Sequence, residues 1–520
     1  MVQTERRLST GNRHEPRNMS WVETTPELGT YGISAWIFLR VLGLIYLVAF
    51  VSLALQIRGL SGKNGIVPAS EVMDPARESR VRGFWRLPTL CWIGTSDRFL
   101  LFLTWGGAIL AVMLAFGFAP LPDLILLWLF YLSLFPVCRP FLSYQWDVLL
   151  LETGFLAIFL GPTEILPCFP PHHEPPRIVI WLFWLLLFRL MFSSGIVKLR
   201  SRDPTWRNRT ALCYHYQTQP LPTPLAWYLH QFPQGFHKLS ASLVFAIELG
   251  CPILMFAPAP SRYIAAGLFI ALMILIEATG NYCFFNLLGI ALSLLLFDDR
   301  VWTSIFQVVG YHAALSFHSA ASPFAFRLLA VIVAPAILLL SVEALIRLFH
   351  YEILWPKQLG RLVQFLTRFY LVNGYGLFAL MTTERPEISV EGSDDGVNWV
   401  AYEFKWKPGN PKRAPPFVAP HQPRLDWQMW FAALGRYENN PWFIRFLIRL
   451  LEGSPAVLGL LRQNPFPEHP PRYVRGVMYD YRFATPSERK PRNFWWRRER
   501  REIYCPPLEL ADVVAGRGQI

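Results

Sequence analysis

The stretch FLSYQWDVLLLETGFLAIFL, Phe141–Leu160, carries two acids, Asp147 and Glu152, within an otherwise apolar run. A charge near the centre of a bilayer costs about 3 kcal/mol unless it finds a partner or water. Asp147 directly follows Tyr144-Gln145-Trp146, where an aspartate at a helix start can cap the free backbone amides. Glu152 lies further along the run, about 7.5 Å deeper at helical rise. We therefore expect Glu152 to meet a cation inside a bundle of helices.

The composition of the whole chain is typical of a membrane protein. Of its 520 residues, 53% are hydrophobic and only 16% are charged, far more apolar than an ordinary soluble protein. In lipid the backbone must satisfy its own hydrogen bonds, so apolar runs of about 20 residues form helices. We expect a membrane all-α bundle of about nine transmembrane helices, formed by Trp36–Gln56, Phe99–Ala119, Asp123–Cys138, Val148–Leu160, Ile178–Ile196, Ala241–Ala257, Tyr263–Thr279, Tyr282–Phe297 and Phe326–Leu348.

The charge and the cysteines exclude several classes of function. The net charge of +13 comes without any nucleic-acid motif, so membrane lipids with anionic headgroups are the expected partner and nucleic acid is not. The seven cysteines include no Cys-x-x-Cys pair. Cys168 with His172 and His173, or Cys213 with His215, lacks the second pair of a closed zinc site. We expect neither a metal nor a cofactor.

The chain divides into four regions. A polar N-terminal tail, 1–35, precedes the transmembrane domain, 36–380; a C-terminal domain, 381–505, and a tail, 506–520, follow. Two long hydrophilic connections interrupt the bundle, and their length predicts that they fold over one of its faces. With nine spans, both connections lie on the same side as the C-terminal domain, and the positive-inside rule places that side in the cytoplasm. The two connections are Arg58–Arg98 and Lys198–Ser240.

The C-terminal domain is predicted to be a soluble α+β unit rich in strands. Glu387–Glu391 alternates, Ser393–Gly396 supplies turn residues, and Val400, Tyr402, Phe404 and Trp406 share one face at period two. Arg472–Phe483 alternates again. Helical spacing appears around Trp427 and in Trp442–Leu461, with a bend near Gly453-Ser454-Pro455. Phe494–Arg501 mixes tryptophan with arginine, which suits the headgroup level of a membrane.

Ionisable residues within the apolar runs are candidates for function. Three acids, Glu152, Glu248 and Glu277, face two possible counter-ions, Arg40 and Arg189. They either line a polar cavity or form structural ion pairs. A transporter remains a third class of function, with the three acids along a water path. Near a helix end, Glu343 and Arg347 are four residues apart and are expected to pair locally.

A second constellation surrounds Lys198. The small residues Ser193-Ser194-Gly195 allow close helix packing just before it. A desolvated lysine can act as a base, whereas a lysine that ends a membrane helix commonly anchors it at the interface. Both readings stay open on the sequence.

Several long motifs resemble the lipase maturation factor family. The resemblance covers most of the chain beyond Trp36. The motifs are FLSYQWDVLLLETGFLAIFL, FRLMFSSGIVKL with the Trp206 loop, TGNYCFFNLLGIALSLLL at Thr279–Leu296, YGLFALMTTERPEISVEGSDDGVNWVAYEFKWKPG from Tyr375, PHQPRLDWQMWFAAL from Pro420 and NPWFIRFLIRLLEGSPAVL from Asn440.

The resemblance implies a non-enzymatic, multi-pass protein of the endoplasmic reticulum membrane. Members of the family assist the folding and assembly of secreted lipases, with a lumenal C-terminal region that contacts the client. A bacterial member would instead occupy the inner membrane. We expect client binding at exposed aromatic residues of the C-terminal domain, with core packing as the alternative for each. The candidates are Trp399, Trp406, Trp427 and Trp430.

Two shorter resemblances add alternatives. Gly195–Leu199 with Trp206 is similar to the membrane part of vitamin K-dependent γ-carboxylases, in which a lysine at the equivalent place is a base. This likeness implies an enzyme that uses Lys198, with Glu152 and His215 nearby, on a lipid-like or quinone-like substrate. SDDGVNW, Ser393–Trp399, resembles turns of galactose-binding-like β-sandwiches and implies a β-sandwich-like recognition module.

Overall fold

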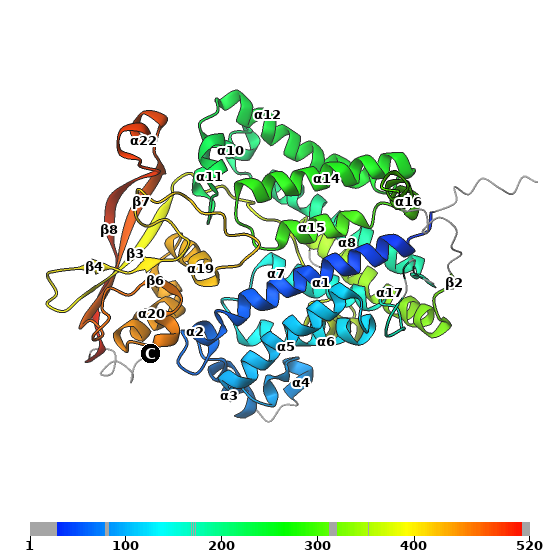
Figure 1. Cartoon of the computed structure of the whole chain (residues 1–520), viewed down its shortest axis with the longest axis horizontal. Coiled ribbons are helices and arrows are strands. Elements are labelled where there is room, and N and C mark those ends of the chain that lie inside the picture. Colours follow the sequence, from blue (N-terminus) through cyan, green and yellow to red (C-terminus); the bar gives the residue numbers. More distant parts are fainter. Residues whose placement is uncertain are drawn as a thin grey trace, which may run out of the picture.

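The computed structural model describes residues 29–78, 83–167, 169, 171, 173–310, 320–351 and 353–511. Most of the predicted N-terminal tail, Cys168, His172 and the end of the C-terminal tail lie outside these residues. A helical bundle and an antiparallel sheet lie side by side, with α19 and α20 placed between them (Figure 1).

The described residues contain seven helices that are long and apolar enough to cross a membrane, and the predicted count of nine is not confirmed. One of them joins three pieces, α12 (Gln234–Phe245), a π-helical turn (Ala246–Gly250) and α13 (Cys251–Leu254). The other six are α1 (Gly32–Ala54), α5 (Asp97–Phe116), α6 (Pro120–Val137), α8 (Arg177–Arg200), α14 (Ala259–Thr279) and α17 (Phe324–Arg347).

Two further predicted spans are helices shorter than these seven. The helix α7 (Gln145–Ile158) has 14 residues and α15 (Phe285–Leu294) has 10. At 1.5 Å per residue they reach about 21 and 15 Å, against a hydrocarbon core of about 30 Å. Most of their side chains are buried against neighbouring helices. Their apolar composition therefore reflects burial within protein rather than exposure to lipid.

Glycines allow the first two long helices to approach closely. A side chain at Gly43 of α1 would place its Cβ 2.6 Å from the backbone nitrogen of Ala115 on α5. Gly107 of α5 faces the ring of Phe50 in the same way, with a Cβ 2.5 Å from the ring. Ser96 caps the start of α5, where its hydroxyl accepts a hydrogen bond from the Phe99 amide, and Gly117, with φ of 82°, caps its end.

The two long connections fold into short helices, and both contact the C-terminal domain, which the sequence analysis did not predict. Arg449 donates to the Gly65 carbonyl at 2.8 Å, and Trp227 donates to the Ala484 carbonyl at 2.8 Å. The first connection forms α2 (Ile57–Ser61), α3 (Ala69–Glu78), α4 (Gly83–Arg86) and a 3-10 turn (Leu90–Trp92); the second forms α9 (Pro204–Arg207), α10 (Ala211–Thr218) and α11 (Pro224–His230).

Four minor elements complete the transmembrane region. The strands β1 (His173–Glu174) and β2 (Ala320–Ala321) pair in parallel. The helices α16 (Asp299–Val308) and α18 (Lys357–Thr367) flank α17 in sequence.

The C-terminal domain is α+β, but it is not built as two facing sheets. Its main sheet is antiparallel with the order β4-β3-β7-β8, and β5 and β6 form a separate pair. Helices rather than a second sheet pack on it: the ring of Phe443 on α20 lies 5.3 Å from that of Tyr504 on β8. The strands are β3 (Pro386–Ser393), β4 (Val400–Ala401), β5 (Glu403–Phe404), β6 (Leu461–Gln463), β7 (Tyr473–Phe483) and β8 (Trp496–Glu509); the helices are α19 (Arg424–Ala433), a 3-10 turn (Tyr437–Asn439), α20 (Pro441–Leu451), α21 (Pro455–Leu458) and α22 (Pro486–Arg492).

The predicted turn and bend are present. Asp395 accepts hydrogen bonds from the amides of Val397 and Asn398 at 2.8 and 2.7 Å, which shapes the loop between β3 and β4. The bend near Gly453 separates α20 from α21.

Two details differ from the prediction. Val400 is 51% exposed whereas Tyr402 and Phe404 are buried, because the chain leaves β4 and pairs again as β5. Phe494–Arg501 is not a separate tail: most of it belongs to β8, and Trp496 is 1% exposed in the core.

Candidate functional site

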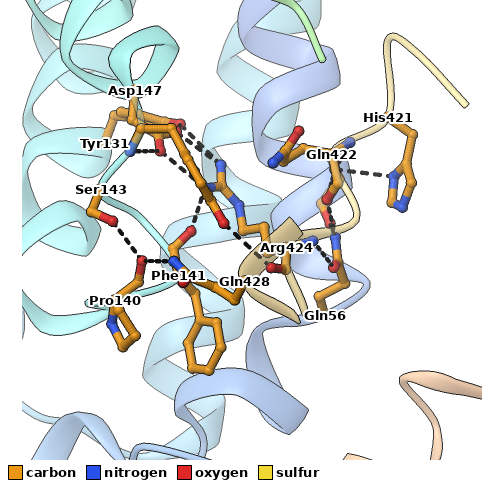
Figure 2. Close-up of polar contacts among 12 residues, drawn as sticks. Gln56, Tyr131, Pro140, Phe141, Ser143, Asp147, His421, Gln422, Arg424 and Gln428 are labelled. Atoms are coloured by element: carbon orange, nitrogen blue, oxygen red, sulfur yellow. Dashed lines mark hydrogen bonds and ion pairs between the residues drawn. The ribbon is translucent and has the colours of Figure 1, made fainter. Parts of the chain in front are cut away.

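A fully buried ion pair connects the C-terminal domain to the helical bundle. Arg424 at the start of α19 donates to both carboxylate oxygens of Asp147 on α7, at 2.9 and 3.0 Å (Figure 2). Both side chains are 0% exposed. Tyr131 donates to the same carboxylate at 2.6 Å, and Arg424 also donates to the Phe141 carbonyl at 2.8 Å. Such bidentate, charge-assisted pairs fix geometry as well as charge.

Asp147 is therefore more than the helix cap that its sequence position suggests. It is the third residue of α7 and accepts a hydrogen bond from the Tyr144 amide, at 3.2 Å, as part of a capping box. The Asp147 carboxylate also accepts hydrogen bonds from Arg424 and Tyr131. Nothing in the apolar run around Asp147 signalled this distant partner.

Neutral hydrogen bonds extend the contact to the end of α1 and the start of α2. Gln56 accepts from the Arg424 amide at 2.9 Å and donates to the Gln422 carbonyl at 2.7 Å. The Ser52 hydroxyl lies 3.0 Å from Nδ1 of His421. Burial and the cations Arg424 and Lys405 lower the pKa of His421 to about 4, so its imidazole is neutral at pH 7. Figure 2 shows these groups on one side of Arg424 and Asp147 on the other.

Two of the four tryptophans expected to bind a client belong to this buried interface. Trp427 is 3% exposed, and its ring lies 4.8 Å from that of Trp146 on α7. Trp430 is 6% exposed and donates to the Thr218 carbonyl at 2.9 Å. Their helical spacing reflects one buried face of α19, which corrects the expectation that they are free for a client.

The other two tryptophans are half-buried. The guanidinium of Arg475 lies 3.9 Å from the ring centre of Trp399, and Trp406 packs beside His421 with ring centres 6.0 Å apart. Each keeps part of its surface open to solvent.

Glu152 has the cationic partner that the sequence predicted. It forms a buried ion pair with Arg189 on α8. The remaining carboxylate oxygen accepts from the Tyr375 hydroxyl at 2.7 Å and the Asn373 amide at 3.1 Å. Arg189 in turn donates to the Asn373 carbonyl at 3.0 Å. The pair therefore holds the segment that leads into the C-terminal domain against the bundle.

Arg40 and Glu277 do not pair as expected. Within the described residues neither forms an ion pair: the guanidinium of Arg40 lies 4.6 Å from the ring centre of Trp36, and Glu277 accepts from the Asn286 amide group at 2.6 Å. Glu343 and Arg347 do form their local ion pair, at 2.7 Å.

Lys198 pairs with Glu248, a partner that the sequence analysis did not assign. Its ammonium donates to both carboxylate oxygens, at 2.5 and 2.7 Å. The π-helical turn that carries Glu248 packs closely on α8 at Gly195, where a Cβ would lie 3.2 Å from that of Glu248. Gly195 thus has the close-packing role that was predicted, and the ammonium of Lys198 is buried against Glu248 rather than placed as an interfacial anchor.

The three residues of the alternative catalytic hypothesis do not meet. Lys198 and His215 line a common cavity of about 340 Å³. Glu152 is not among the residues that line it, because its carboxylate is held by Arg189 and Tyr375. Burial and Lys198 lower the pKa of His215 to about 4. Within the residues that the structure describes, no group of three His, Cys, Asp or Glu side chains could hold a metal ion.

Comparison with known proteins gives matches over most of the chain. The family described as Lipase maturation factor transmembrane domain matches residues 33–304, and that described as Lipase maturation factor C-terminal domain matches residues 371–506. Lipase maturation factor 2 of Mus musculus is 37% identical, over 92% of this chain and 83% of its own length.

Two human relatives match over a similar share of the chain. Lipase maturation factor 2 of Homo sapiens is 35% identical, over 92% of this chain and 82% of its own length. Lipase maturation factor 1 of Homo sapiens is 33% identical, over 93% and 89%. No solved structure matches the chain significantly. The chain therefore belongs to the lipase maturation factor family.

Proposed function

We propose that this chain is a multi-pass protein of the endoplasmic reticulum membrane that assists the folding, assembly and maturation of secreted lipases without catalysing a reaction. The observation that carries the proposal is the 37% identity with Lipase maturation factor 2 of Mus musculus over 92% of the chain. In this proposal the C-terminal domain faces the lumen, where secreted proteins fold; here the proposal follows the family resemblance and departs from the cytoplasmic side that the positive-inside rule favours.

The buried interface supports a role as a rigid platform. Arg424 bonds to Asp147 on α7 and to Gln56 at the start of α2, and Arg385 bonds to the second long connection; all three hydrogen bonds are within 3.0 Å. A surface held in one orientation loses little conformational entropy when it binds a partner. The platform can therefore present the outer face of the sheet to a client that is still folding.

The loop between β3 and β4 is the client contact that we propose. Val397 and Val400 are 78% and 51% exposed, beside the half-buried Trp399. The hydrogen bonds of Asp395 hold the loop in shape. Trp406 remains a second candidate, on the side of the domain near His421.

The experiment removes the cell's own lipase maturation factors and restores this chain together with a secreted lipase of the same organism. The expected result is a rise in secreted lipase activity per lipase molecule when the chain is present. Equal activity with and without the chain would contradict the proposal. A double variant, Lys198→Met with Glu248→Gln, removes both charges of the cavity pair and should keep the effect, whereas an enzyme based on Lys198 would lose it.

A second measurement tests the contact itself. Co-precipitation of lipase should fall for Val397→Ser with Val400→Ser, because the apolar contact is lost. Ile503→Ser is the matched control: Ile503 is 49% exposed on β8, at the opposite edge of the sheet from β4. Equal loss in both variants would contradict a contact confined to the loop.

A further inference from the structure

A cavity of about 340 Å³ lies between α8, α10, the α12–α13 span and α14. Its size falls at the lower end of the range for small-molecule sites, about 300–1,000 Å³. Aliphatic and aromatic side chains from three membrane-spanning helices form most of its wall, among them Leu190, Val244, Ile247, Leu272 and Ile276.

The cavity opens toward the lipid. Leu243 and Leu275 line it and are nevertheless 53% and 63% exposed. They stand on two neighbouring spans, Gln234–Leu254 and Ala259–Thr279. A molecule dissolved in the bilayer can therefore enter between these spans without crossing water.

Four polar side chains in the lining are already arranged in two pairs. Lys198 is held by both oxygens of Glu248, so this pair carries no net charge. Nε2 of His215 lies 3.2 Å from the Tyr282 hydroxyl, and the lowered pKa of His215 keeps its ring neutral. The polar part of the cavity is thus neutral overall. An anion placed there would leave an uncompensated charge among apolar groups, which is costly.

We propose that this cavity binds a neutral lipid with a single acyl chain and a hydroxyl headgroup, of which a monoacylglycerol is the example. The chain lies among the aliphatic side chains of the α12–α13 span and α14. The headgroup hydroxyls bond to His215 and Tyr282, because a hydroxyl can donate or accept and so suits either tautomer of the ring. Nothing in this site depends on the binding of a lipase.

The test uses the full chain in phosphatidylcholine nanodiscs and a monoacylglycerol that carries a photoreactive diazirine in its acyl chain. Labelled peptides should come from Gln234–Leu254 and Ala259–Thr279. Unlabelled monooleoylglycerol should compete at least tenfold better than oleate or octadecene, since each lacks the neutral hydroxyl group (~10-fold is about 1.4 kcal/mol).

Two variants on one helix separate the cavity from the general lipid surface. Ile276→Trp fills the cavity and should lower labelling about tenfold. Ile274→Trp is the control, because Ile274 is 53% exposed on the same helix and does not line the cavity. Both proteins are first shown to be monodisperse with unchanged melting temperatures, so that a loss of label is not a loss of fold.

A third variant tests the headgroup end. His215→Phe keeps a ring of similar shape but removes the hydrogen bond, and should weaken competition by monooleoylglycerol while leaving that by octadecene unchanged. Labelling that is spread evenly over all the spans, or that is equal in Ile276→Trp and Ile274→Trp, would overturn the proposal. Oleate competing as well as monooleoylglycerol would overturn it too.

Discussion

At the scale of single residues, the fully buried pair of Arg424 and Asp147 is expected to contribute strongly to stability. Arg424→Met leaves the Asp147 carboxylate buried without its cation, which destabilises a protein by about 3–5 kcal/mol. The double variant with Asp147→Asn should recover much of this loss, because no charge is then left uncompensated. Melting temperature in detergent, followed by size-exclusion chromatography, measures both effects.

The matched control for this pair is Arg436→Met. Arg436 pairs with Glu438 at 2.8 Å, but its side chain is 79% exposed, so its loss should leave the melting temperature almost unchanged. A melting temperature for Arg424→Met that equals that of Arg436→Met would show that the buried pair does not hold the interface.

A second residue-scale prediction concerns His421 and pH. Its pKa is lowered from 6.5 to about 4 by burial and by Arg424 and Lys405, so the unfolded chain takes up this proton more readily than the folded one. Its contribution to stability is therefore complete above pH 6.5 and is lost as the pH falls toward 4. His421→Gln should reduce the fall in melting temperature between pH 7 and pH 4.5. His469→Gln, at an exposed histidine, should not; identical pH profiles for the two variants would contradict the assignment.

Residue pairing could be predicted from the sequence only in part. Glu152 and Arg189 were candidates because both are charges in apolar runs, and in lipid each demands a partner. Arg424 gave no such signal, since an arginine in a hydrophilic segment is ordinarily exposed. Its partner is 277 residues away. Burial of this arginine is decided by the docking of the whole C-terminal domain.

At the scale of elements, close packing of α1 on α5 makes a prediction about glycine. Gly43→Ala places a Cβ within 3.0 Å of three backbone atoms of α5, which cannot turn aside as a side chain can. Overpacking of this kind costs about 1–3 kcal/mol. Gly267→Ala on α14 is the control, because nothing lies within 4 Å of its Cβ and alanine favours the helix by about 1 kcal/mol. Opposite shifts in melting temperature are expected; equal shifts would refute the close approach.

The sequence predicts an element reliably when its pattern of apolar residues can arise in only one way. Seven long runs are apolar and long enough to span, and all seven were found. For α7 and α15 the same apolarity arises from burial by protein, and composition does not separate the two causes. β8 was missed because its exposed side chains are arginines and glutamates, a composition that protects a sheet edge from pairing with other chains.

At the scale of the whole molecule, the transmembrane and C-terminal parts form one folded body. Both long connections contact the C-terminal domain, through Glu71 with Arg445 and through Trp227 with Ala484. The sequence predicted that the two long connections and the C-terminal domain lie on the same side of the membrane. The sequence could not predict that these three regions share one hydrophobic core. The apolar faces of α19 and of the connections fit together only after each has folded.

This shared core predicts that the C-terminal domain is not independent of the membrane part. Expressed alone, residues 371–511 would expose Trp427 and Trp430, both at most 6% exposed in the full chain, and would leave Arg424 without its carboxylate. An apolar patch of this kind leads to self-association. The fragment should therefore elute as aggregates from a size-exclusion column, and co-expression with residues 1–370 should recover a monodisperse complex in detergent. An isolated fragment that stays monomeric and melts cooperatively would show that the interface is dispensable for the fold of the domain.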